Sequence, residues 1–270
     1  MWKNRLFNRI VWGTILSILT VAIILLFPPM FLTVFVGIWV TMATREFLLL
    51  LQRAEISLNQ WLLITLNLLM LILAQYRLIP ALIILPMGIV FITALLHPSP
   101  LPRIPVYGLF TITYLGFLPS HLILLQQLAI KHSYSSWLTL FPLIISWVSD
   151  TAAYVGGQIF GRHKLAPMVS PQKTVEGALA GLITAGILAG IWLPMLTPFR
   201  TQPRFLLVLI GIGLSVIGQI GDIFESTFKR AVGVKDSAPT LGEHGGFLDR
   251  ADSLLFTIPT FYYLTLLTNQ

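Results

Sequence analysis

The side chains that could act together on a substrate gather between positions 150 and 252, where eight of the ten Asp and Glu residues lie. A hard divalent ion such as Mg²⁺ takes one or two carboxylates from a protein and shares its other positions with water and substrate phosphates. Asp222 comes from one segment and the i, i+3 pair Asp249 and Asp252 from another, and these carboxylates could converge on such an ion. Interleaved cations suit a polyphosphate, whose charge has to be offset. These cations are Lys229, Arg230, Lys235 and Arg250.

The richest of these segments starts where the apolar run 205–221 ends. A helix continuing past residue 221 would carry four polar side chains on one face, namely Asp222, Glu225, Ser226 and Lys229. Further along, Gly245 and Gly246 follow His244, and paired glycines permit close backbone approach. The alternative is a charge-balanced hairpin held together by its own ion pairs.

A second polar segment, 146–161, runs out of an apolar span. In a helix its spacing of four residues would align Ser146, Asp150, Tyr154 and Gln158 in one stripe. A carboxylate at that depth is costly unless it meets a cavity, a cation or a partner. The alternative is that Asp150 caps the following helical turn at the membrane interface.

A third segment, 161–177, is a basic loop that ends at a helix start. Lys173, the Thr174 hydroxyl and a new helix N-terminus could together receive an anion. The equally simple alternative is a solvated positive loop that contacts acidic lipid headgroups.

The elements that must position these residues lie in a membrane. The 270 residues are 56% hydrophobic and only 10% charged, and the mean hydropathy is +0.85. Such a chain cannot cover a water-facing surface and also hide its apolar excess. We expect an all-α polytopic membrane protein with about nine spans, of which the first, after Lys3, Arg5 and Arg9, is an uncleaved helix. The spans are 10–27, 30–44, 61–76, 78–96, 107–124, 138–149, 177–195, 205–221 and 253–267, with breaks at Pro28-Pro29, Arg45-Glu46 and the prolines around residue 100.

Basic residues indicate the orientation. If the nine spans alternate, Arg77, Lys131, Arg200 and Arg204 fall on one side and the other 13 of the 17 Lys and Arg residues on the other. Such residues are retained in the cytoplasm, which places the N-terminus and the loops 150–176 and 222–252 there and the C-terminus outside. The net charge of +7 then reflects topology, so we expect no nucleic-acid partner. The absence of cysteine excludes disulfides, thiolate metal sites and cysteine nucleophiles.

The uneven distribution of acids divides the chain into two parts. Residues 1–137 are expected to form scaffold helices and to contact lipid, and residues 138–270 to form the catalytic region. In the first part the acids are Glu46 and Glu55.

At the polar segments the chain resembles the phosphatidate cytidylyltransferase family, also called CDP-diacylglycerol synthases. Upstream segments around Asp150, Arg162 and Lys173 resemble the family too, so the likeness covers about residues 146–253. The family pattern is matched by Ser226, Lys229, Arg230, Lys235, Asp236, Ala238, Leu241, Gly242, His244, Gly245, Gly246, Asp249, Arg250 and Asp252.

This resemblance implies a membrane-embedded enzyme that condenses CTP with phosphatidate to give CDP-diacylglycerol and pyrophosphate. It also implies Mg²⁺, potassium as a second ion, a homodimer, and a site that faces the cytoplasm from the inner or plasma membrane. Asp222 and Asp249 resemble metal ligands, with Asp150, Asp236 and Asp252 as weaker candidates. His244 could protonate or bind the departing pyrophosphate, or only shape the turn. The remaining residues expected to contact substrate are Lys173, Thr174, Ser226, Lys229, Arg230, Lys235, Gly245, Gly246 and Arg250.

Two other functions compete with this one. A CTP-dependent polyprenol kinase has shorter motifs that partly overlap, and it would transfer the γ-phosphoryl group instead of a nucleotidyl group. An ion-coupled transporter could use Asp150 and Asp222 as a coupling pair. Transporters, however, usually carry broken segments in both halves, and here the polar chemistry lies in one half.

Overall fold

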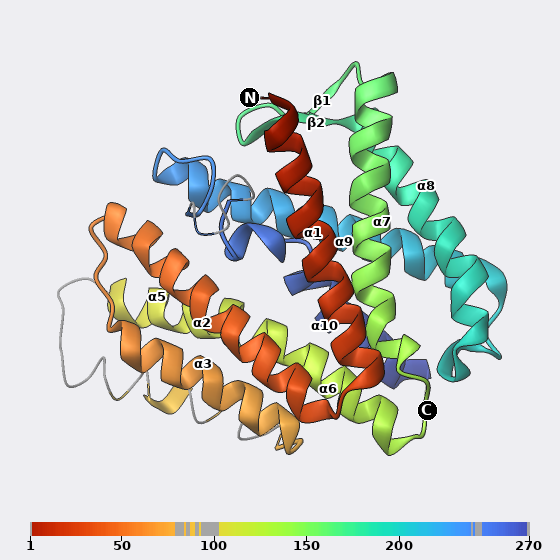
Figure 1. Ribbon diagram of the computed structural model, residues 1–270, viewed down its shortest axis with the longest axis horizontal. Coiled ribbons are helices and arrows are strands. Elements are labelled where there is room, and N and C mark those ends of the chain that lie inside the picture. The colour runs from red at the N-terminus through yellow and green to blue at the C-terminus, as the bar shows by residue number, and fades with distance from the viewer. Residues whose placement is uncertain are drawn as a thin grey trace. The chain divides into compact units, whose positions relative to one another are not determined.

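The computed structural model is almost entirely helical (Figure 1). It describes residues 2–78, 84, 87–89, 92, 103–238, 240 and 245–268, and for residues 2–12, 103 and 104 the backbone alone. Among these residues, five helices are long and apolar enough to cross a membrane, and three shorter helices are also apolar. The prediction of an all-α polytopic membrane protein is confirmed. The predicted span 78–96 lies mostly outside the described residues, so the number nine stays a prediction.

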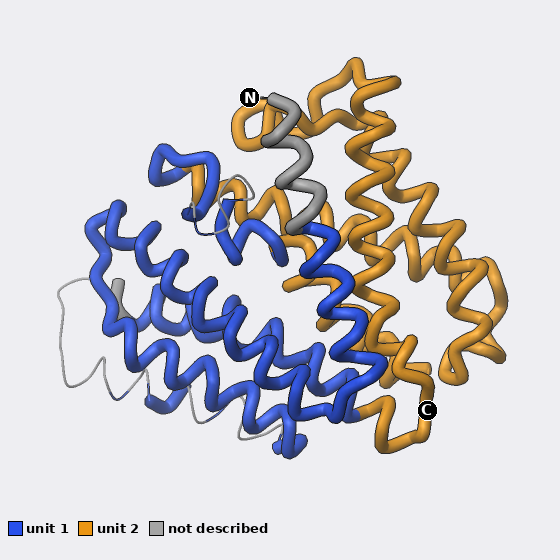
Figure 2. Tube along the Cα trace, in the orientation of Figure 1, with its two compact units in different colours: residues 1–127, 231–251 blue, residues 128–230, 252–270 orange. Residues whose placement is uncertain are grey.

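The chain forms two compact units, coloured separately in Figure 2. The first unit contains residues 1–127 and 231–251, and the second contains residues 128–230 and 252–270. The segment 231–251, which the sequence assigned to the catalytic part, therefore packs with the N-terminal helices. Whether the predicted division at residue 137 separates scaffold from catalysis is a question of function that packing does not test.

The helices of the first unit follow the predicted spans with one difference. They are α1 (Trp2–Leu26), α2 (Pro29–Arg53), α3 (Gln60–Gln75), α5 (Arg103–Ile112), the π-helical turn η1 (Thr113–Phe117), α6 (Leu118–Lys131, which continues into the second unit) and the 3-10 turn η5 (Leu248–Arg250). Pro29 occupies the first turn of α2, where its missing N–H costs nothing. The side chain of Asn59 caps α3 by accepting a hydrogen bond from Leu62 N.

The difference concerns the break predicted at Arg45-Glu46. Helix α2 runs through both residues to Arg53, so that prediction is wrong. Arg45 is exposed, whereas Glu46 is 97% buried. The helix can continue because the carboxylate of Glu46 finds hydrogen-bond donors inside the protein, as described below.

The second unit consists of four long helices and a small hairpin. Its elements are α7 (Trp137–Phe160), β1 (Lys164–Ala166), β2 (Ser170–Thr174), α8 (Val175–Trp192), the 3-10 turns η2 (Leu193–Met195) and η3 (Thr197–Phe199), α9 (Arg204–Ala231) and α10 (Leu254–Thr268). Helices α7 and α8 approach closely at small residues: a Cβ on Gly177 would lie 2.5 Å from Ala153 O, and a Cβ on Gly156 would lie 2.5 Å from Ala180 Cβ. Small residues at such contacts are typical of helices packed in membranes.

The predicted loops of the second unit are more regular than expected. Residues 150–160 continue α7, residues 222–231 continue α9, and β1 and β2 form an antiparallel hairpin in place of an irregular loop. The hairpin is closed by the carboxylate of Glu176, which accepts hydrogen bonds from Arg162 N at 3.0 Å and His163 N at 3.2 Å. These backbone donors explain a hairpin in a sequence with little strand character.

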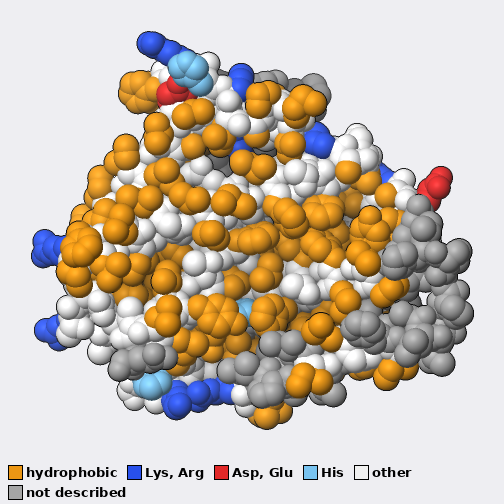
Figure 3. Space-filling model, turned by 180° about the vertical axis from the view of Figure 1, so that it is seen from behind, with side chains coloured by type: hydrophobic (Ala, Val, Ile, Leu, Met, Phe, Trp, Pro, Cys, Tyr) orange, Lys and Arg blue, Asp and Glu red, His pale blue; other side chains and the backbone are white. Residues whose placement is uncertain are grey.

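Apolar side chains remain exposed along the helices. Leu179, Ile183, Ile187 and Ile191 recur every four residues on α8 and are all more than half exposed. Figure 3 shows hydrophobic side chains spread over the face it presents, with few charged ones. Exposed apolar area of this kind suits lipid contact and supports the assignment as a membrane protein.

Candidate functional site

Three carboxylates and a lysine of the second unit form what we call the polar edge: Asp150 on α7, Lys173 on β2, Asp222 on α9 and Asp252 just before α10. The start of α10 is tied to α7 by a chain of hydrogen bonds. Ser146 Oγ donates to Ser253 Oγ at 2.9 Å, and Ser253 Oγ donates to Asp150 Oδ2 at 3.1 Å. The predicted polar stripe of α7 is therefore helical, and Asp150 accepts from a neighbouring element.

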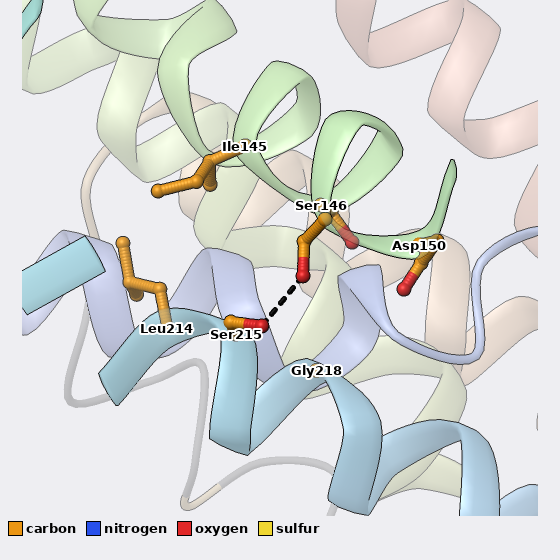
Figure 4. Close-up of a pocket in the computed structure, with 7 residues that line it drawn as sticks. Ile145, Ser146, Asp150, Leu214, Ser215 and Gly218 are labelled. Atoms are coloured by element: carbon orange, nitrogen blue, oxygen red, sulfur yellow. Dashed lines mark hydrogen bonds between the residues drawn. The ribbon is translucent and has the colours of Figure 1, made fainter. Parts of the chain in front are cut away.

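A narrow polar pocket lies below Asp150, between α7 and α9 (Figure 4). Ser149 and Ser215 share a hydrogen bond of 2.5 Å across it. Gln219 Nε2 donates to Ser215 Oγ at 3.2 Å. Polar groups in a membrane helix need such partners, since lipid offers none. The pocket is lined by Ile145, Ser146, Ser149, Asp150, Leu214, Ser215 and Gly218.

Lys173 and Asp222 form the closest charged contact of the polar edge. Lys173 Nζ lies 2.5 Å from Asp222 Oδ2, which is the separation of a close ion pair. The Nζ atom is shielded from solvent and has no hydrogen-bond partner among the described residues. An ammonium group can donate three hydrogen bonds, so Lys173 holds unused donor capacity beside a carboxylate.

The carboxylates of the polar edge repel one another. Removal from water, followed by the charges of Asp222 and Asp150, raises the pKa of Asp252, and the Ser253 N–H and Lys229 oppose that shift less strongly. Like charges this close disfavour simultaneous ionisation. The polar edge therefore holds three carboxylates against one ammonium group, and a bound cation would offset the excess negative charge.

Two of the cations expected to act on substrate have protein partners. Lys229 Nζ lies 2.9 Å from Glu225 Oε1, and both side chains are buried. Arg230 Nε donates to Val169 O in the hairpin at 3.0 Å. The charge-balanced alternative considered above is thus realised for the Lys229–Glu225 pair, one turn apart on α9.

The other expected anion contacts of the second unit also have structural partners. Thr174 caps α8, where its hydroxyl accepts a hydrogen bond from Gly177 N at 3.2 Å. This N–H of the helix terminus is therefore occupied. Ser226 is buried on α9.

In the first unit, Asp249 holds the end of the segment 231–251. Its Oδ2 atom accepts hydrogen bonds from Ser237 N at 2.9 Å, Ser237 Oγ at 2.9 Å and Gly246 N at 2.7 Å. Gly245 has a φ of +75°, and a Cβ there would lie 2.6 Å from Asp249 Oδ2. The backbone at Gly245 therefore lies close to Asp249, and contact of Gly245 and Gly246 with substrate stays a prediction.

The structure does not test the proposed pairing of Asp222 with Asp249, because the two residues belong to different units. Across the described ranges, no three His, Asp or Glu side chains converge closely enough to hold an ion by themselves. Lys235, Asp236 and Arg250 are exposed, and His244 lies outside the described residues. The metal-ligand assignments therefore stay predictions.

One residue that the sequence analysis left in the scaffold is part of this arrangement. Glu46 on α2 accepts hydrogen bonds from the same segment that carries Asp249. The available signal was an acid inside an apolar run, which by default indicates function.

Comparison with known proteins gives one matching family model and many relatives. The cytidylyltransferase family model matches residues 7–268. A phosphatidate cytidylyltransferase of Staphylococcus epidermidis is 44% identical over 129 residues, which are 48% of this chain and 49% of that protein. The enzyme of the same name from Bacillus subtilis is 44% identical over 124 residues, 46% of this chain and 45% of that protein. An uncharacterized protein of Escherichia coli, YnbB, is 45% identical over 126 residues, 47% of this chain and 41% of that protein. The match spans about half the length of these curated relatives.

Proposed function

We propose, because the chain belongs to the cytidylyltransferase family, that it is a phosphatidate cytidylyltransferase. A phosphate oxygen of phosphatidate attacks the α-phosphorus of CTP, the bond from that phosphorus to the bridging oxygen of the β-phosphate breaks, and pyrophosphate leaves. The observation that carries the proposal is Lys173, which lies against Asp222 with unused donors. A cation and a carboxylate in contact can bind a nucleotide phosphate and its metal together.

The residues present are compatible with Mg²⁺. Asp222 would hold it, with Asp150 or Asp252 as a second carboxylate, and one or two protein carboxylates are what Mg²⁺ usually takes when substrate phosphates complete its shell. Bound there, Mg²⁺ would offset charge on the phosphates during nucleotidyl transfer. Asp249, Asp236 and a second, potassium ion remain expectations from the family resemblance.

Charge neutralisation and positioning account for most of the required catalysis. Attack of one phosphate on another brings anions together, and a phosphomonoester needs no general base near neutral pH. Lys173 would orient the CTP phosphates, and Lys229 and Arg230 would add positive charge at the end of α9. His244 is proposed to meet the leaving pyrophosphate.

The proposed site faces the cytoplasm, where CTP is made. This orientation follows from the distribution of basic residues, which are retained on that side. Single cysteines introduced at Ser170 and Ala238 should react with an impermeant reagent from the cytoplasmic side alone, and reaction from the outside would contradict the orientation. Phosphatidate is proposed to reach the site within the membrane. The exposed apolar faces are also compatible with the expected homodimer.

Labelled CTP separates the proposed reaction from phosphoryl transfer. The purified protein is incubated with Mg²⁺, either phosphatidate or a polyprenol, and CTP labelled at the α- or the γ-phosphate. We expect label from the α-phosphate to enter the lipid with phosphatidate as acceptor. Label from the γ-phosphate on a polyprenol would indicate a kinase instead, and no labelled lipid would overturn the proposal.

A further inference from the structure

The carboxylate of Glu46 is surrounded by hydrogen-bond donors from four residues between positions 237 and 248 of the first unit. Its Oε1 atom accepts from Thr240 Oγ1 at 2.6 Å and from Phe247 N at 3.0 Å. Its Oε2 atom accepts from Ser237 Oγ at 2.9 Å and from Leu248 N at 3.0 Å. Two hydroxyls and two backbone amides are thus gathered on one side chain of α2.

Helix α2 makes a second polar contact with the same segment. Trp39 Nε1 donates to Phe247 O at 2.9 Å. Trp39 and Glu46 are seven residues apart, which places them two turns apart on one face of the helix. The N–H and the C=O of Phe247 are therefore both bound to α2.

Ser237 links Glu46 to Asp249. Its hydroxyl oxygen lies 2.9 Å from Glu46 Oε2 and 2.9 Å from Asp249 Oδ2, and a hydroxyl has one proton to donate. The Ser237 N–H also donates to Asp249 Oδ2. A shift of Glu46 would consequently be passed on to Asp249 through one residue.

The backbone at Gly246 lies directly against Glu46 and Ser237. A Cβ on Gly246 would overlap both Glu46 Oε2 and Ser237 Oγ. Because the packing is this close, a change at the Glu46 carboxylate should shift the backbone around Gly246.

We propose that Glu46 is a positioning residue of the reaction, which fixes the conformation of Ser237 and of residues 245–249 and so the orientation of Asp249. This inference rests on the proposed function and on the family resemblance, by which Asp249 is expected to be a metal ligand. A buried carboxylate in an apolar helix is costly, and four hydrogen bonds into a motif segment account for its presence better than a scaffold role does.

Glu46→Gln is the direct test because it preserves shape. The amide retains one acceptor oxygen, so either Phe247 N–H or Leu248 N–H would face an NH₂ group. We expect hydrogen exchange at residues 246–248 to accelerate at least tenfold, kcat to fall at least tenfold, and the Mg²⁺ concentration for half-maximal activity to rise. Glu55→Gln, at an exposed acid just beyond α2, is the matched control and should change none of these.

The outcomes separate this inference from the proposed function. A wild type that fails to transfer cytidylyl groups would overturn the proposed function. Hydrogen exchange does not depend on activity, so it would still test the contact of Glu46 with the Phe247 and Leu248 N–H groups. Faster exchange with an unchanged Mg²⁺ dependence would reduce Glu46 to a structural residue and overturn the inference, as would unchanged exchange. If Glu46→Gln does not fold, Thr240→Val is the second variant, because it removes one donor to Glu46 at an exposed position. Hydrogen exchange at residues 246–248 should then accelerate and the Mg²⁺ concentration for half-maximal activity should rise, both by less than in Glu46→Gln.

Discussion

The acidic residues of the two units differ in how many hydrogen-bond donors surround them. In the first unit, four donor groups surround Glu46 and three surround one oxygen of Asp249, and the two carboxylates share the single proton of the Ser237 hydroxyl. In the second unit, Asp222 has Lys173 as its one polar contact among the described residues, and Lys173 Nζ has no hydrogen-bond partner there. Groups with filled hydrogen-bonding capacity hold a shape, whereas groups with unused capacity can bind a ligand. The comparison assigns a shape-holding role to Glu46 and to the Oδ2 atom of Asp249, and ligand binding to Asp222 and Lys173.

The largest expected effect is that of Asp222→Asn. The substitution removes a charge from the polar edge without breaking a hydrogen bond that the fold needs, so the protein should insert and purify normally. Turnover should fall by about 10³-fold, because loss of a carboxylate on the metal costs several kcal/mol of charge stabilisation. Steady-state assays with phosphatidate vesicles measure this. Activity within tenfold of the wild type would contradict the assignment of ligand binding to Asp222.

Lys173→Ala should have the next largest effect. A charge-assisted hydrogen bond to phosphate is worth about 1.5–3 kcal/mol, so KM for CTP should rise or kcat should fall about tenfold or more. Arg45→Ala and Arg53→Ala, in the same predicted cytoplasmic region, are matched controls and should leave the kinetics nearly unchanged. Equal, small effects in all three variants would make Lys173 a simple topology signal.

Gly246→Ala tests the shape-holding side of the comparison. The added methyl group would overlap Glu46 Oε2 and Ser237 Oγ, and overpacking of this kind costs about 1–3 kcal/mol. We expect a lower thermal midpoint and a fall in kcat, with CTP affinity retained. Gly213→Ala is the control, because a Cβ at Gly213 has no neighbour within 4 Å. Normal stability and activity in Gly246→Ala would show that the segment is not held tightly.

The smallest effect concerns pH. Because the pKa of Asp252 is raised, this carboxyl keeps its proton at a higher pH than an ordinary Asp does, and Mg²⁺ has to compete with that proton. Lowering the pH through the raised pKa should weaken Mg²⁺ activation a few-fold, and raising it should strengthen activation. Mg²⁺ titrations of activity between pH 6 and 9 measure this, and Asp252→Asn should flatten the dependence. A dependence that persists in the variant would assign it to another group.

The sequence predicted those features that depend on residues close together in the chain. Apolar runs located the described spans, and the spacing of four residues placed Asp150 and Ser146 on one face of α7, because helix geometry is set by neighbours in the chain. The ion pair of Lys229 with Glu225 is another such local feature.

The partners of Glu46 could not be predicted in this way. They lie 191 to 202 residues further along the chain, and nothing in the spacing of α2 indicates which segment meets it. The hairpin β1–β2 was missed for a similar reason, since it is closed by Glu176 and contacted by Arg230 from outside the two strands.

Equilibrium binding of CTP in the presence and absence of Mg²⁺, measured by calorimetry on the purified protein, tests the ligand-binding role of the polar edge most directly. The account predicts that the wild type binds CTP more tightly with Mg²⁺, that Asp222→Asn abolishes this enhancement, and that Glu55→Gln retains it. The same Mg²⁺ enhancement in Asp222→Asn and in the wild type would contradict the account.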